Sequence, residues 1–149
     1  MSQAFEILNA LEAMHPRKEG WLFLREFRNG TAFRGDAQQR FDALAFHAWP
    51  SSKGAPFLRR VFELKVSDVD LANELKNPDK RWVAKAISHE FYWVAPTGLI
   101  VLSKIERDEG LIEWDGAKIE IKRRARTRET MPPKWSFVAS LIRRLEKIT

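Results

Sequence analysis

The sequence contains no cysteine, which excludes disulfide bonds, cysteine-ligated zinc and thiol catalysis. It also lacks any stretch close to the roughly 18 consecutive apolar residues that a membrane-spanning helix needs. Residues 1–16 carry acids and no continuous apolar run, so they predict an amphipathic helix and not a signal peptide. Glycines stand singly, and no glycine-rich phosphate-binding loop is present. We therefore expect a cytoplasmic protein without membrane contact.

Positive charge is in excess: Lys and Arg total 26 and Asp and Glu total 20, which gives a formal net charge of +6. Such a balance favours an anionic partner, with nucleic acid first. A length of 149 residues fits one domain that buries a core of its own. We predict a single domain over residues 1–149, with its core at 3–122 and a basic segment and helix at 122–149.

Hydrophobic periodicity and chain-breaking residues together predict a mixed α/β layout. Turns are expected at Asn29-Gly30 and Asp115-Gly116, and Ser67 is expected to cap a helix. Trp82 is expected to point inward from its helix. Helices are predicted at 3–15, 67–76, 79–89 and after Pro132-Pro133, and strands at 21–28, 39–48, 58–66, 90–95, 99–102 and 111–122.

The pattern Glu-x-Lys occurs three times, at residues 63–65, 74–76 and 120–122. Residues two apart on a helix do not share a face, so the copy at 74–76 is interpreted as a solvated pair. The copy at 120–122 adjoins a basic run and is interpreted as an exposed strand. Glu63 and Lys65 lie on an otherwise apolar strand, where both project to one side and their apolar neighbours project to the other.

A second acid stands in the preceding strand, because Asp42 lies 21 residues before Glu63 in the apolar stretch FDALAF. If the two strands are neighbours, Asp42 approaches Glu63. Two carboxylates and the main-chain oxygen of Leu64 then form a hard oxygen site suited to Mg²⁺ or Mn²⁺. Such an ion polarises a phosphate and lowers the pKa of a bound water, which Lys65 would orient. An ordinary ion pair between Lys65 and either acid explains the same spacing equally well.

The residues around this pattern carry a resemblance. The stretches QRFDALAFHAWPS, RRVFELKVS and ELKNPDK follow one another, and a strand ending in Ala-Pro comes next, all within residues 20–115. This order resembles the PD-(D/E)XK nuclease superfamily, and more closely the small phage and bacterial DNA repair proteins of the MmcB type. The resemblance implies a restriction-endonuclease-like α/β core with a mixed central β-sheet flanked by helices. Phe41 stands where the superfamily motif has proline.

The resemblance further implies a Mg²⁺- or Mn²⁺-dependent deoxyribonuclease in which Asp42 and Glu63 hold the metal and Lys65 assists. Superfamily members often add a Glu from the first helix or an early strand, and Glu12 and Glu26 are the candidates. The implied substrate is branched or single-stranded DNA, processed during repair, recombination or phage replication in a bacterial cell or phage-infected host. Relatives that cut branched DNA are often dimers, so the pattern is compatible with a homodimer.

Two features of the remaining sequence bear on this function. A basic run follows the predicted core and is expected to contact the DNA backbone, although such runs are usually solvated faces. Trp114 and Trp135 flank it and are candidates for stacking on bases. His89 and Glu90 open a strand and are interpreted as structural. The basic run comprises Lys122, Arg123, Arg124, Arg126 and Arg128.

Superfamily members can keep the fold and lose catalysis. The alternative function is therefore a non-catalytic nucleic-acid-binding module on the same scaffold.

Overall fold

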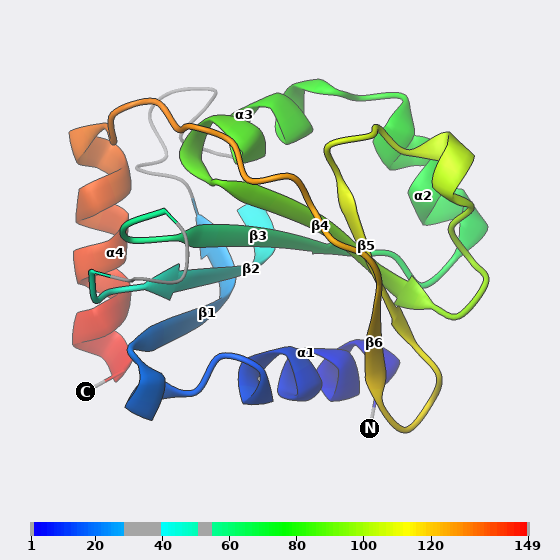
Figure 1. The fold of residues 1–149 in the computed structure, drawn as a ribbon, viewed down its shortest axis with the longest axis horizontal. Coiled ribbons are helices and arrows are strands. Elements are labelled where there is room, and N and C mark those ends of the chain that lie inside the picture. The colour runs from blue at the N-terminus through cyan, green and yellow to red at the C-terminus, as the bar shows by residue number, and fades with distance from the viewer. Residues whose placement is uncertain (1, 29–39, 51–54, 149) are drawn as a thin grey trace.

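A computed structural model describes residues 2–28, 40–50 and 55–148 of the chain, and its elements run from α1 near the N-terminus to α4 near the C-terminus (Figure 1). The mixed α/β layout predicted from the sequence is confirmed. The turn expected at Asn29-Gly30 lies outside the described residues. The elements are α1 (Gln3–Ala13), η1 (Arg17–Glu19), β1 (Trp21–Arg28), β2 (Arg40–His47), β3 (Arg59–Leu64), α2 (Asp68–Leu75), α3 (Asp79–Ile87), β4 (Glu90–Pro96), η3 (Leu102–Lys104), β5 (Gly110–Trp114), β6 (Ile119–Arg123) and α4 (Trp135–Ile148).

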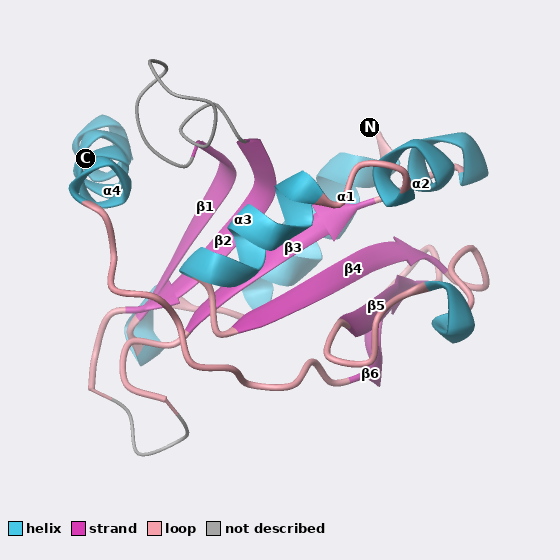
Figure 2. Ribbon diagram, turned by 90° about the horizontal axis from the view of Figure 1, so that it is seen from above, coloured by secondary structure: helices cyan, strands magenta, loops and turns pink. Residues whose placement is uncertain are grey.

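The strands form one six-stranded sheet in the order β1-β2-β3-β4-β5-β6. Strands β1, β2 and β3 pair antiparallel, β3, β4 and β5 pair parallel, and β5 and β6 close as an antiparallel hairpin. Parallel neighbours need a crossover connection. Helices α2 and α3 supply it between β3 and β4, and they cover one face of the sheet while α1 covers the other (Figure 2).

Side chains from β3 and β4 alternate between two apolar cores. Val61 and Phe91 pack with residues of α2 and α3, whereas Phe62 and Tyr92 pack with residues of α1. Both faces of these strands are therefore buried, as is usual for parallel strands in α/β proteins. A charged residue of β3, such as Glu63, must consequently find its partners beneath a helix and not in water.

The helix starts agree with the sequence. The side-chain oxygens of Ser2 and Ser67 accept hydrogen bonds from the backbone N–H groups of Phe5 and Asp70, at 3.3 and 3.2 Å. These bonds satisfy donors that the first helical turn leaves unpaired. Within the described residues, no helix has the length and apolar character that crossing a lipid bilayer requires.

Two local predictions are wrong. The strand predicted at 99–102 is absent, because the turn at Pro96, closed by the N–H of Leu99 on the Pro96 carbonyl, returns the chain onto the apolar core. Trp82 is 67% exposed and does not point inward. Helix α3 instead buries Arg81 and Ala84, because the ion pair of Arg81 with Glu109, directly before β5, sets its rotation.

Substituting Gly110 tests the packing between β4 and β5. A Cβ atom at Gly110 would collide with the Tyr92 ring and lie 2.7 Å from the backbone nitrogen of Ala125. We expect Gly110→Ala to lower the free energy of unfolding in urea by about 1–3 kcal/mol. The comparison is Gly98→Asn, where no atom lies within 4 Å of the added Cβ and the φ of +82° adds backbone strain without a collision, so its loss should be smaller than that of Gly110→Ala. A loss for Gly110→Ala no larger than that for Gly98→Asn would mean that the strands part to admit the methyl group at little cost.

Candidate metal centre

Backbone pairing between β2 and β3 includes Ala43 but does not reach Asp42, the preceding residue. The last recorded pair joins Ala43 to Phe62, and continuing the count places Asp42 opposite Glu63. At this point the Asp42 Oδ2 atom accepts a hydrogen bond of 2.8 Å from the backbone N–H of Leu64. A side chain therefore takes the place of a strand-to-strand bond, and β2 and β3 diverge (Figure 2). The predicted approach of Asp42 to Glu63 is confirmed.

Glu63 projects beneath the two crossover helices and is only 1% exposed. Lys65 follows β3 directly, and its backbone N–H donates to the Val94 carbonyl at 2.9 Å, which keeps it beside β4. Its Nζ atom lies 3.8 Å from Glu63 Oε2. The two residues thus share one side of the strand, and Phe62 and Leu64 pack on the other side, as the sequence predicts.

Two further residues complete the site, and the sequence analysis did not find either. Lys80 at the start of α3 places its Nζ atom 3.2 Å from each carboxylate oxygen of Glu63. Glu74 of α2 lies 3.1 Å from the Lys65 ammonium and 3.8 Å from that of Lys80. We refer to Asp42, Glu63, Lys65, Glu74 and Lys80 as the acid–lysine cluster.

The interpretation of Glu74 as part of a solvated pair is wrong. Its side chain is 8% exposed, whereas Lys76 is exposed. The reason is helical spacing: Glu74 lies three residues after Leu71 and directly before Leu75, which both pack on the core. A residue three positions after one core residue and next to another lies at the buried face of the helix. That spacing is the sequence signal that could have identified Glu74.

Burial governs the protonation of Glu63. It raises the pKa of Glu63 to about 8, with the charges of Asp42 and Glu74 adding to the rise and those of Lys80 and Lys65 opposing it. Burial lowers the pKa of Lys65, but the pull of Glu74 and Glu63 outweighs it and the net pKa is raised. A further positive charge at Glu63 would favour the carboxylate form. The cluster is therefore short of positive charge.

The residues fit a divalent cation. The Oε1 atom of Glu63 is buried and has no hydrogen-bond donor among the described residues, although Lys80 lies in ion-pair distance. Asp42 supplies a second carboxylate on the adjacent strand, and the main chain of Leu64 lies against it. Oxygen donors of this kind suit Mg²⁺ or Mn²⁺. Asp42, Glu63 and the Leu64 carbonyl are therefore the groups that would hold such an ion.

The structure separates the two candidates for a third acid. Glu12 lies on α1, where Arg25 pairs with it at 3.0 Å and where it lines a cavity of about 740 Å³ that none of the cluster residues lines. Glu26 lies on β1 between residues that pair with Phe41 and Ala43, which places it level with Asp42. Glu26 is also exposed and has a φ of +50°, a conformation rare for any residue except glycine. Such strain often marks functional positions.

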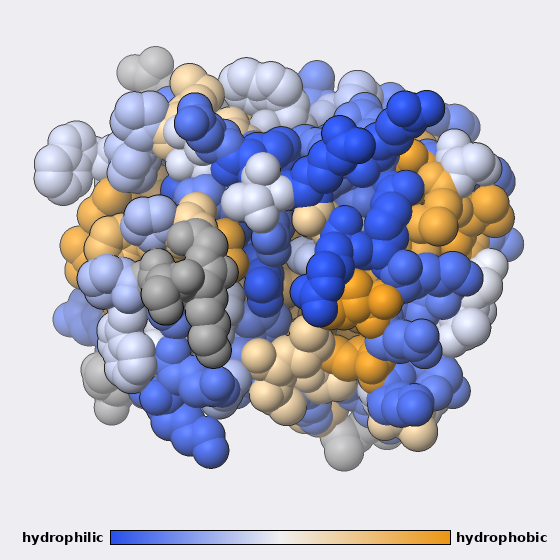
Figure 3. Space-filling model, in the orientation of Figure 1, coloured by the Kyte–Doolittle hydropathy of each residue, from blue (hydrophilic) through white to orange (hydrophobic). Residues whose placement is uncertain are grey.

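The basic run divides into internal and exposed members. Arg123 donates to the carbonyls of Glu106 and Glu109, and Arg128 donates to the Lys85 carbonyl at 2.9 Å. These two arginines fasten the segment after β6 to the protein. Lys122, Arg124 and Arg126 are exposed, and Lys122 lies 3.7 Å from a Glu113 oxygen. The segment crosses the view in Figure 1, and hydrophilic side chains dominate the upper middle of that face in Figure 3.

This segment runs to the end of the strands away from the cluster. The backbone N–H of Arg128 donates to the His89 carbonyl, immediately before β4 begins. Glu90, the first residue of β4, pairs with Arg60 near the start of β3, whereas Glu63 and Lys65 lie at its end. Direct contact between the basic run and a ligand at the cluster would therefore require a ligand that spans the strands.

The other candidate residues take structural positions. His89 accepts a hydrogen bond from the Arg59 backbone at 3.1 Å, and Glu90 pairs with Arg60 at 2.8 Å, as the sequence interpretation expected. Trp114 is 7% exposed, so its expected role in stacking on bases is wrong. Trp135 is 85% exposed and remains available for such a role.

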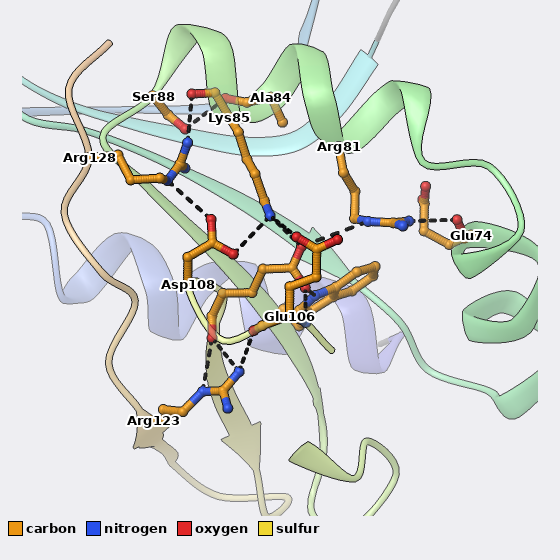
Figure 4. Close-up of polar contacts among 11 residues, drawn as sticks. Glu74, Arg81, Ala84, Lys85, Ser88, Glu106, Asp108, Arg123 and Arg128 are labelled. Carbon is orange, nitrogen blue, oxygen red and sulfur yellow. Dashed lines mark hydrogen bonds and ion pairs between the residues drawn. The ribbon is translucent and has the colours of Figure 1, made fainter. Parts of the chain in front are cut away.

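A second acidic group lies on the same face of the sheet. The carboxylates of Glu106, Asp108 and Glu109 come close enough together to hold a metal ion. The Lys85 ammonium already lies 2.9–3.0 Å from an oxygen of each (Figure 4). Glu109 also accepts hydrogen bonds from the Trp93 indole and the Glu106 backbone. These carboxylates therefore already have a cation among them.

Comparisons with known proteins bear on the fold alone. No protein-family model matches the chain, and no protein with a curated description does. A solved structure, described as the SPO1766 protein of unknown function from Silicibacter pomeroyi, matches with a TM-score of 0.60 at 20% identity. The match covers 95% of this chain and 88% of that one. It supports a mixed α/β fold with a central sheet flanked by helices.

The raised pKa of Glu63 predicts a specific pH dependence of stability. A folded-state pKa of about 8, against an ordinary value of 4.5, means that folding strengthens proton binding. This contribution is fully present below pH 4.5 and is lost as the pH rises through about 8, by at most about 1.4 kcal/mol per pH unit. The free energy of unfolding of the wild type, relative to Glu63→Gln, should fall over this range in urea titrations. A difference that stays constant between pH 4.5 and 8 would mean that Glu63 is ionised throughout this range.

Proposed function

We propose that the protein is a metal-dependent DNA nuclease that hydrolyses phosphodiester bonds in DNA repair, recombination or phage DNA processing. One observation carries the proposal: Asp42 and Glu63, from adjacent strands, meet where strand pairing ends, with Lys65 beside them. An ordinary structural ion pair would not require a second acid, here the half-buried Asp42, at the same place. The order of one helix, three antiparallel strands, a helical crossover and a parallel strand also supports a PD-(D/E)XK-type core.

Each residue has a chemical role in this proposal. Asp42 and Glu63 would hold Mg²⁺ or Mn²⁺, which supplies Lewis acidity and a more acidic bound water. Lys65, fixed between Glu74 and Glu63, would orient the attacking water or balance the charge that develops on the phosphate. The hydrogen bond from the Leu64 backbone N–H to Asp42 holds that carboxylate at the point where β2 and β3 diverge.

Positive charge near the cluster supports a phosphodiester substrate. Arg28 and Arg40 are paired across β1 and β2, two residues beyond the level of Asp42, and both are exposed. Like charges directly opposite one another destabilise a sheet, and a bound anion relieves that cost. The exposed Arg124 and Arg126, together with the net charge of +6, would add salt-dependent contacts to the DNA backbone.

One observation favours the alternative of a non-catalytic nucleic-acid-binding module. Both lysines of the cluster already form ion pairs with its acids, so the acids have partners without a metal. This alternative predicts DNA binding that weakens with salt and survives Lys65→Ala.

Cleavage assays separate the two functions. The purified protein with Mn²⁺ should cut at least one of single-stranded, duplex, flapped and four-way DNA. Lys65→Ala should reduce the cleavage rate by at least about a hundredfold, because the group that assists the water is lost. Asp42→Ala should weaken Mn²⁺ binding, measured by calorimetry, by more than about tenfold. If no substrate is cut while salt-dependent DNA binding persists in Lys65→Ala, the non-catalytic module is the correct function.

The third ligand can be identified with a matched pair of variants. Glu26→Gln should raise the Mn²⁺ dissociation constant by about tenfold, because this carboxylate is level with Asp42. Glu12→Gln removes the same charge on the α1 side, where Arg25 holds the side chain, and should leave Mn²⁺ binding unchanged. The opposite result would place the metal on the α1 side of the sheet, and no change in either variant would exclude both residues as ligands.

A further inference from the structure

The geometry points to Lys80 as the residue that occupies the place of a metal ion beside Glu63. We propose that the Lys80 ammonium would leave Glu63 when a divalent ion binds there, and that it would then bind a phosphate of the substrate. This inference rests on the proposed nuclease function and adds a residue that couples metal binding to substrate binding.

The two lysines of the cluster serve different acids. Lys80 lies 3.2 Å from both oxygens of Glu63 and 3.8 Å from Glu74. Lys65 has the reverse preference, at 3.1 Å from Glu74 and 3.8 Å from Glu63. If Glu63 turns to a metal ion, Lys65 keeps its closer partner and Lys80 loses its own. Lys80 is therefore the lysine that metal binding sets free.

The helix that carries Lys80 is anchored independently of Glu63. Lys85 and Arg81 of α3 lie 3.0 and 3.7 Å from Glu109, and the Arg81 guanidinium donates to the Glu74 carbonyl at 2.7 Å (Figure 4). Release of Lys80 thus requires only a rotation of its own side chain, which is 26% exposed and can reach solvent. The helix itself need not move.

Charge balance gives the direction of the change. Without metal, three carboxyl groups of the cluster face two ammonium groups, so any excess charge is negative. Adding a divalent cation to two ammonium groups gives four positive charges against three negative ones, an excess of one. Metal and Lys80 repel each other at Glu63, and the surplus positive charge favours a phosphate diester.

The test measures metal and DNA binding separately in Lys80→Met. Mn²⁺ binding is titrated by calorimetry without DNA, and binding of a DNA duplex is measured at several salt concentrations with Ca²⁺ in place of Mn²⁺. Lys80→Arg retains the charge, and Lys118→Met removes an equal charge from the exposed turn between β5 and β6. Lys80→Gln replaces Lys80→Met if the latter does not fold.

Opposite changes are expected in the two measurements. Lys80→Met should bind Mn²⁺ more tightly, by about threefold or more, because a competing cation is gone. Its DNA affinity should fall, and the slope of log affinity against log salt should lose about 0.9, the value of one phosphate contact. Lys80→Arg should resemble the wild type in both measurements, and Lys118→Met should leave Mn²⁺ binding unchanged.

Parallel changes would overturn the inference. If Lys80→Met weakens both Mn²⁺ and DNA binding, or changes neither, Lys80 is a structural partner of Glu63 and nothing more. These outcomes are independent of cleavage. A wild type that cuts DNA while Lys80→Met binds Mn²⁺ no better retains the nuclease function and loses this inference. A wild type that cuts nothing but shows the opposite changes loses the nuclease function and retains the coupling.

Discussion

The burial of one carboxylate, that of Glu63, determines the polar organisation of this part of the protein. A charged group in a strand with apolar packing on both faces is costly unless it has partners. Its partners come from two separate segments: Lys65 directly after β3 and Lys80 on α3. The contact of Lys80 with Glu63 joins helix α3 to the end of β3.

The two buried glutamates, Glu63 and Glu109, have different kinds of partners. Glu109 accepts hydrogen bonds from an indole and a backbone N–H, which are neutral donors fixed in place, in addition to its ion pairs with Lys85 and Arg81. Glu63 is met by ammonium groups on flexible side chains. One oxygen of each glutamate has no hydrogen bond within the described part of the chain. Fixed donors suit a structural carboxylate, whereas exchangeable cations suit one that binds a ligand.

The sequence predicts three of the cluster residues and the strands, apart from the absent one at 99–102, because these depend on local pattern. Alternation on β3 and the breakers around it predict that Glu63 and Lys65 share a side, and strand adjacency brings Asp42 opposite. Glu74 and Lys80 were missed, because their contribution depends on how α2 and α3 are rotated over the sheet. Burial of Arg81 instead of Trp82 has the same origin: an ion pair with Glu109, remote in sequence, sets the rotation of α3.

Helix α3 holds two buried carboxylates, Glu63 of β3 and Glu109 directly before β5, with lysines at positions 80 and 85. Five residues along a helix advance it by about 7.5 Å, and each residue rotates the side-chain direction by about 100°. One residue more or fewer between them would turn one ammonium away from its glutamate. The number of residues between Lys80 and Lys85 is therefore constrained. An exposed position between them, such as Trp82, can be substituted, but no residue can be inserted or deleted there.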